Sequence, residues 1–113
     1  MTQQRAHQRY PIRLAADVNT GQETFPARAK NLSVGGVGLE LDRAIEPQSL
    51  IAISLFLVED GIEDATVGTL DLHGQMIWIA PLDRGGYEGG VRFAPIQPAQ
   101  TRQLQGFLDR LRA

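Results

Sequence analysis

Residues 12–19 read IRLAADVN, with an apolar side chain at every second position. Because successive side chains of a β-strand point to opposite faces, this alternation predicts a strand with one buried face. The same pattern returns over residues 25–30 and 37–42. Residues 50–58 are apolar at nearly every position and predict a strand that is buried more completely.

The second half of the chain continues the strand pattern. Residues 67–72 and 75–80 predict one long strand with a bend or bulge at Gly74, and residues 87–94 predict the last strand. Clusters of Asn, Asp, Gly and Pro separate the apolar runs, as turns require. About six or seven short strands at this spacing predict an antiparallel β-barrel or sandwich.

The C-terminal end changes to the period of a helix. Four apolar side chains recur there at helical spacing, namely Leu104, Phe107, Leu108 and Leu111. This stripe predicts an amphipathic helix over residues 98–112, with Pro98 well placed at its start. We expect the helix to pack on the barrel, so that residues 11–113 form one domain. Residues 1–10 are expected to form a mobile arm outside it.

Length and composition limit the class of protein. A chain of 113 residues, of which 42% are hydrophobic, can build one core without disulfides or metal. The chain has no cysteine and no apolar run as long as a signal peptide or a membrane span, so we expect a cytoplasmic protein without membrane insertion. A net charge of −2 is unlike that of a general nucleic-acid binder, so neither DNA nor RNA is an expected partner.

The positive charge is concentrated at the N-terminus. Arg5, His7, Arg9 and Arg13 lie in a segment that has no acidic side chain. A basic arm on a mildly acidic body indicates a local site for an anion. Arg5 and Arg9 are four positions apart, and a guanidinium group matches phosphate oxygens or the edge of guanine with two hydrogen bonds. Taken alone, such a pair is more often a solvated basic tail.

A second polar motif lies between two predicted strands, where residues 31–36 read NLSVGG. Asn and Ser side chains form hydrogen bonds with the backbone of turns, and adjacent glycines allow a positive φ and a close approach of the backbone. Taken alone, this segment is an ordinary connection between strands. Together with the arginine pair it is much more specific.

The combined pattern is Arg-x-x-x-Arg at residues 5–9 and Asn-x-Ser-x-x-Gly at residues 31–36. It resembles the PilZ domain, a bacterial family of receptors for the second messenger cyclic di-GMP. The resemblance extends through the predicted strands at residues 75–79 and 89–93 to the C-terminal helix. It implies a six-stranded antiparallel β-barrel with a flanking helix, in agreement with the strand pattern.

The resemblance also implies which residues bind the nucleotide. They are Arg5, Arg9, Asn31, Ser33 and Gly36. The arginines would contact guanine edges and phosphates, the Asn and Ser side chains would hold a guanine, and the glycine would leave room for backbone or ligand. Gly35 is a further candidate, and so is Trp78, which either packs in the core or stacks on a base. Residues 2–4 are Thr-Gln-Gln where some members carry basic residues, so one ligand molecule and a stacked pair both stay open.

The motifs of common enzyme classes are missing from the sequence. It contains no Gly-x-Ser-x-Gly elbow, no phosphate-loop lysine and no His-Glu-x-x-His zinc motif. His7 and His73 have no partner at the spacing of metal ligands, so neither metal nor cofactor is expected. We expect a receptor that changes conformation on binding cyclic di-GMP and relays the signal to an effector protein. The alternative is a PilZ-like interaction module that does not bind nucleotide, although such a module would be expected to lack the arginine pair.

Overall fold

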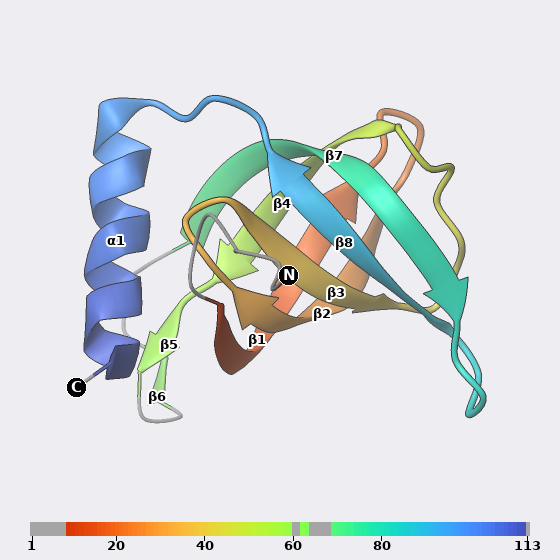
Figure 1. Ribbon diagram of the computed structural model, residues 1–113, viewed down its shortest axis with the longest axis horizontal. Coiled ribbons are helices and arrows are strands. Elements are labelled where there is room, and N and C mark those ends of the chain that lie inside the picture. The colour runs from red at the N-terminus through yellow and green to blue at the C-terminus, as the bar shows by residue number, and fades with distance from the viewer. Residues whose placement is uncertain (1–8, 60–61, 64–68, 113) are drawn as a thin grey trace, which may run out of the picture.

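The computed structural model describes residues 9–59, 62–63 and 69–112. Six antiparallel strands close into a barrel in the order β1-β2-β3-β8-β7-β4, and Figure 1 shows α1 standing to one side of it. The barrel strands are β1 (Tyr10–Asn19), β2 (Thr24–Leu32), β3 (Gly36–Leu41), β4 (Leu50–Phe56), β7 (Thr69–Pro81) and β8 (Tyr87–Phe93). A separate two-stranded sheet pairs β5 (Val58–Glu59) with β6 (Ile62–Glu63), and α1 spans Pro98–Arg112. The predicted barrel with a C-terminal helix is confirmed.

The apolar side chains of the strands and the helix share one core. In β1 the side chains of Leu14, Ala16 and Val18 are buried, at positions that the alternation predicts. In α1 three apolar side chains are buried in the same cluster, namely Leu104, Phe107 and Leu108. Full burial of each Leu or Phe side chain stabilises the fold by about 1.5–3 kcal/mol. No helix in the part of the chain that the structure describes is long and apolar enough to cross a membrane.

The glycine in the middle of β7 has a different role from the one predicted. The expectation of one long strand is correct, but Gly74 lies in regular register, paired with Ile51 of β4 and Phe93 of β8. The prediction of a bulge at this residue is therefore wrong. A Cβ atom at Gly74 would lie 2.6 Å from Cγ1 of Val91 and 2.7 Å from the carbonyl oxygen of Arg92. Glycine is required here because β8 approaches closely.

The bulge in β7 lies three residues further on, at Ile77. Met76 pairs with Val91 and Trp78 pairs with Gly90, so Ile77 is an extra residue in β7. Met76 is fully buried, and strict alternation would point Trp78 into the core as well. The extra residue turns Trp78 outward instead, where its side chain is 48% exposed. Of the two interpretations of Trp78, core packing is wrong.

Candidate functional site

A row of four residues crosses the outer face of the barrel. Asn31 of β2 pairs with Gly38 of β3, which pairs in turn with Gly90 of β8. Gly90 also pairs with Trp78 of β7. Since neighbouring strands lie about 4.8 Å apart, the row extends over about 14 Å. We call Asn31, Gly38, Gly90 and Trp78 the shelf row.

The two glycines form the floor of the shelf row, and the other two side chains lie over them. A Cβ atom at Gly38 would lie 2.6 Å from Nδ2 of Asn31. A Cβ atom at Gly90 would collide with Nε1 of Trp78 and would lie 2.9 Å from Cδ1 of the same ring. Together with Arg9, the shelf row lines a hollow of about 370 Å³. This volume lies within the range of about 300–1,000 Å³ that is usual for small-molecule sites.

Arg9 joins the arginine motif to the shelf row. Its Nη1 atom donates a hydrogen bond of 2.9 Å to Oδ1 of Asn31, and its side chain is otherwise exposed. The guanidinium group is held just before the first strand, since β1 begins at Tyr10. Arg5, the other arginine of the motif, lies outside the described residues. The structure therefore brings one residue of each sequence motif into direct contact.

Ser33 lies beneath the surface and is fully engaged with the turn between β2 and β3. The residue is 3% exposed. Its Oγ atom accepts hydrogen bonds from the backbone N–H groups of Gly35 and Gly36, each at 3.1 Å, and donates one of 3.4 Å to the carbonyl oxygen of Gly36. The backbone N–H of Ser33 donates a further bond of 2.9 Å to the same carbonyl. Ser33 thus holds the shape of the turn that follows Asn31.

Gly35 and Gly36 attach this turn to the end of β8. The carbonyl oxygen of Gly35 accepts a hydrogen bond of 2.9 Å from the backbone N–H of Phe93. A Cβ atom at Gly36 would collide with the carbonyl oxygen of Val91. Among the described glycines, φ is positive at residues 21, 85 and 86, and neither glycine of this turn is one of them. Close approach of the backbone, and not a positive φ, explains the need for glycine at position 36.

Sequence reasoning missed the two glycines of the floor. Gly38 and Gly90 occupy outward positions in strands where a polar side chain would normally stand. A glycine inside a strand often marks a place where a ligand or another backbone approaches closely. That signal was present in the sequence, but only the strand pairing reveals that the two glycines face each other.

The outer face is acidic on one side of the shelf row, and these acids are already paired. Nζ of Lys30 lies 2.9 Å from Oε2 of Glu88 and 3.5 Å from Oε2 of Glu40. Nη2 of Arg84 lies 2.8 Å from the same oxygen of Glu40. The hydrogen bond to Glu88 raises the pKa of Lys30 above its ordinary value. Lys30 and Arg84 are therefore engaged by carboxylates of their own face.

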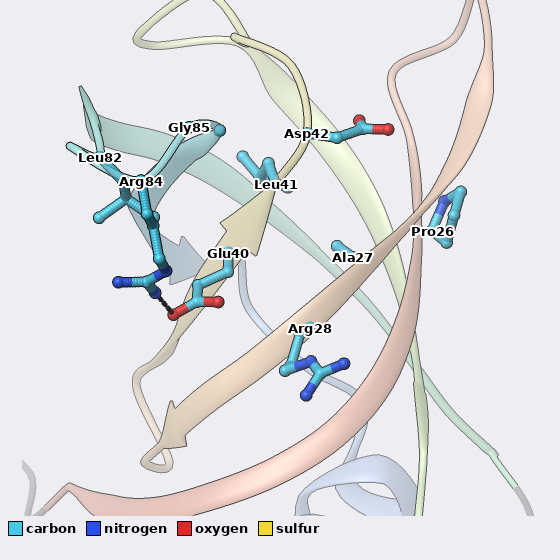
Figure 2. Close-up of a pocket in the computed structure, with 10 residues that line it drawn as sticks. Pro26, Ala27, Arg28, Glu40, Leu41, Asp42, Leu82, Arg84 and Gly85 are labelled. Atoms are coloured by element: carbon cyan, nitrogen blue, oxygen red, sulfur yellow. Dashed lines mark hydrogen bonds and ion pairs between the residues drawn. The ribbon is translucent and has the colours of Figure 1, made fainter.

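A second hollow, of about 480 Å³, lies on this acidic side between β2, β3 and the turn that precedes β8. Figure 2 shows the side chains of Arg84 and Glu40 pointing toward one another along its edge. Asp42 and Arg28 also line it. Since it combines paired opposite charges, this hollow is less suited to a doubly charged anion than the first. Within the described residues, no group of three or more His, Asp or Glu is placed to hold a metal ion.

The sequence matches the family model of the PilZ domain over residues 3–110. No curated protein matches the chain. Among solved structures, the PilZ domain of Escherichia coli YcgR with c-di-GMP has a TM-score of 0.78 and 20% identity, and the match covers 97% of this chain and 92% of that one.

Two longer proteins contain the same fold. The structure of Bacillus subtilis MotI/DgrA, an inhibitor of motility, has a TM-score of 0.76 at 15% identity, with 96% of this chain and 51% of that chain covered. The Klebsiella pneumoniae MrkH–c-di-GMP complex has a TM-score of 0.75 at 15% identity, with 97% and 53% covered. The chain thus spans about half the length of these two proteins. At such identities the likeness shows the fold alone.

Proposed function

The chain belongs to the PilZ domain family, and on that premise we propose that it is a receptor module for cyclic di-GMP. The observation that carries the proposal is the contact between Arg9 and Asn31 beside the glycine floor of the shelf row. This contact joins the two sequence motifs at one hollow. Cyclic di-GMP carries two phosphates and two guanines, and the hollow offers groups suited to both.

Each polar or aromatic side chain at the hollow suits one part of the ligand. Arg9, together with Arg5 from the arm, would bind phosphate oxygens or a guanine edge with paired N–H donors. The amide of Asn31 offers both a donor and an acceptor to a guanine. The half-exposed ring of Trp78 would stack on a base, an interaction of about 1–3 kcal/mol per base. The glycine floor leaves room for the side chains of Asn31 and Trp78, which would meet the ligand above it.

We propose that Ser33, Gly35 and Gly36 contribute to ligand binding indirectly, through the turn that they form. The hydroxyl of Ser33 already makes three hydrogen bonds with the backbone of its own turn. These bonds fix the chain that leaves Asn31 and keep its amide over Gly38. Direct contact between Ser33 and a guanine would require the turn to give up one of these bonds.

The arm is the element that we propose to change on binding. The predicted arm of residues 1–10 carries two arginines and no acid. Its last two residues are already placed, since Tyr10 lies in β1 and Arg9 contacts Asn31, whereas chain entropy and charge repulsion oppose docking of the residues before them in the absence of an anion. Ligand phosphates would neutralise both arginines and hold the arm against the shelf row. An effector protein would then recognise the rearranged surface. In this role the module regulates a partner in the cytoplasm and catalyses no reaction.

One observation favours the alternative, an interaction module that does not bind nucleotide. Leu50 is 76% exposed and lines a hollow of about 380 Å³ together with Ala52 and His73. An exposed apolar side chain beside such a hollow offers a place for an apolar side chain of another protein. The same surface would also serve the effector of a receptor, so it does not oppose nucleotide binding. That neither DNA nor RNA is a partner stays a prediction, based on the net charge of −2.

Calorimetric titration with cyclic di-GMP tests the proposal. We expect saturable binding by the wild type and a dissociation constant at least about tenfold higher for Arg5→Ala and for Arg9→Ala. The reason is that a charge-assisted hydrogen bond contributes roughly 1.5–3 kcal/mol, and ~1.4 kcal/mol is one decade in affinity. Arg102→Ala, an exposed arginine of α1, is the matched control and should bind like the wild type.

The titration also separates the two candidate functions. Undetectable binding by the wild type would overturn the receptor proposal and favour the interaction module. Normal binding by both arginine variants would place the nucleotide somewhere other than the shelf row. The fitted number of sites distinguishes one ligand molecule from a stacked pair.

A further inference from the structure

Four outward positions on β3 and β8 form a block that includes the two glycines of the shelf row, and only one of the four carries a side chain. Gly38 pairs with Gly90, and the neighbouring pair is Gly36 with Arg92. Three of the four positions are therefore glycine, and Arg92 is the remaining one. Its side chain lies beside three glycines, two of which are covered by the side chains of Asn31 and Trp78.

Arg92 is a cation without a carboxylate partner among the described residues. Its side chain is exposed, and its hydrogen bond is a long one of 3.4 Å, donated from Nη2 to Oε1 of Gln75 on β7. The described ion pairs of this outer face engage Lys30 and Arg84 instead. To contact a ligand, the guanidinium of Arg92 has to give up only a long hydrogen bond to a neutral amide. This costs less free energy than giving up an ion pair.

Different charges lie on the two sides of the shelf row. Along β8 the outward residues are Glu88, Gly90 and Arg92, and along β3 they are Glu40, Gly38 and Gly36. Carboxylates thus lie on one side of the glycine floor and Arg92 on the other. Lys30 and Arg84 neutralise the carboxylates of the first side, so of the residues described on β3 and β8 the cation left to attract an anion on the floor is Arg92 on the second side.

Arg92 also lies within reach of the floor. Residues two apart on a strand are separated by about 6.6–6.8 Å, and they point to the same face. The path from Arg92 to the hollow passes Gly36, which has no side chain, and leads to the Trp78 ring that lies over Gly90. An arginine side chain is long enough to bring its guanidinium over such a gap.

From this arrangement we propose that Arg92 is a further binding residue of the site and receives a phosphate of the nucleotide on the side away from Glu40 and Glu88. The inference rests on the proposed function, because it concerns the same ligand at the same hollow. Arg92 lies outside both sequence motifs, so neither motif assigns it a role. It would complement Arg9, which stands at the Asn31 end of the shelf row.

The test is calorimetric titration of cyclic di-GMP into the wild type, Arg92→Ala, Arg92→Lys and Arg28→Ala. Arg28 is the matched control, because it is an exposed arginine of β2 whose strand partner is Glu40, on the acidic side of the shelf row. We expect Arg92→Ala to raise the dissociation constant about tenfold or more. Arg92→Lys should fall between this variant and the wild type, since it keeps the charge but loses the fork of donors. Arg28→Ala should stay within about twofold of the wild type.

The possible results distinguish this inference from the proposed function. Wild-type binding that Arg92→Ala leaves unchanged would overturn the role of Arg92 and leave the receptor proposal standing. An equal loss in Arg92→Ala and Arg28→Ala would also overturn it, because the effect would then be one of overall charge. No binding by the wild type would overturn both proposals together. Circular dichroism and thermal unfolding of each variant show that a loss of binding is not a loss of fold.

Discussion

Arg9 and Asn31, 22 positions apart in the chain, meet through a hydrogen bond of 2.9 Å from Nη1 of the arginine to Oδ1 of the amide. The contact lies where β1 begins and attaches Arg9, the residue before Tyr10, to β2. Only the oxygen of the amide can accept from a guanidinium, so the bond also orients the Asn31 side chain. Its Nδ2 atom is left as a donor above Gly38.

This orientation predicts different results for two substitutions of Asn31. Asn31→Ala removes both the acceptor for Arg9 and the donor above the floor, and we expect affinity for cyclic di-GMP to fall about tenfold. Asn31→Asp retains an acceptor for Arg9 and should stay within a few-fold of the wild type. Isothermal titration of the two variants measures both effects. Equal affinities for Asn31→Ala and the wild type would show that the amide does not contact the ligand.

Trp78 provides a direct optical signal of binding. It is the single tryptophan of the chain, and its ring is half exposed over Gly90. If a guanine stacks on the ring, saturating cyclic di-GMP should change the intrinsic fluorescence. Trp78→Ala should weaken binding by roughly 5- to 150-fold, since stacking contributes about 1–3 kcal/mol per base, while Trp78→Phe should retain most of the affinity. Unchanged fluorescence at ligand saturation would argue against a base on this ring.

The floor of the shelf row can be blocked by a single methyl group. A Cβ atom at Gly90 would collide with the Nε1 atom of Trp78, so Gly90→Ala should displace the ring and reduce affinity by at least about tenfold. The matched control is Gly106→Ala in α1, where an added Cβ meets nothing within 4 Å. That variant should bind normally and gain up to about 1 kcal/mol in stability from helix propensity. Normal binding by Gly90→Ala would contradict the proposal that the ligand binds over the glycine floor.

We expect the main effect of replacing Ser33 to be a loss of stability of the fold. Ser33→Ala leaves the backbone N–H groups of Gly35 and Gly36 without their acceptor in a turn that is largely buried. The expected loss is about 1–3 kcal/mol, which corresponds to about 4 °C in Tm per kcal/mol for a domain of this size. Ser54→Ala removes an exposed hydroxyl bonded to Asp71 and should change stability by less than about 0.5 kcal/mol. Thermal unfolding that fails to separate the two variants would contradict the structural role of Ser33.

The pairing of Lys30 with Glu88 predicts a dependence of stability on alkaline pH. Glu88 raises the pKa of Lys30 above its ordinary value of 10.5, so the folded protein holds this proton more tightly than the unfolded chain. The contribution to stability is therefore complete below pH 10.5 and is lost as the pH rises past the pKa of folded Lys30. Because the two side chains are 37% and 32% exposed, the pair is worth less than about 1 kcal/mol.

Urea unfolding of the wild type and Glu88→Gln at a series of pH values measures this contribution. The difference in the free energy of unfolding should be small and constant from about pH 7 to pH 9, and should shrink above about pH 10.5. If the difference in the free energy of unfolding grew at alkaline pH, it would contradict a stabilising pair of Lys30 and Glu88.

The sequence alone determined the class of the fold and much of its detail. Alternation such as that of residues 12–19 places one face of each strand in the core whatever the neighbouring strand is, because side-chain direction has a period of two. The stripe from Leu104 to Leu111 likewise predicted a helix with the bounds that the structure has, since the period of a helix is also a local property. The resemblance to the PilZ domain then added the arginine pair and residues 31–36 as one site.

The tertiary structure alone decided where the bulge in β7 lies and what it does to Trp78. The apolar pattern predicted a bend or bulge at Gly74. The register against β8 instead leaves Ile77 unpaired and turns Trp78 outward. The pairing of Gly38 with Gly90, and the place of Arg92 beside them, likewise depend on which strands become neighbours. The alternation within a strand excludes a shift of one residue against its neighbour but allows a shift of two. The exact register between distant strands therefore emerges only in the closed barrel.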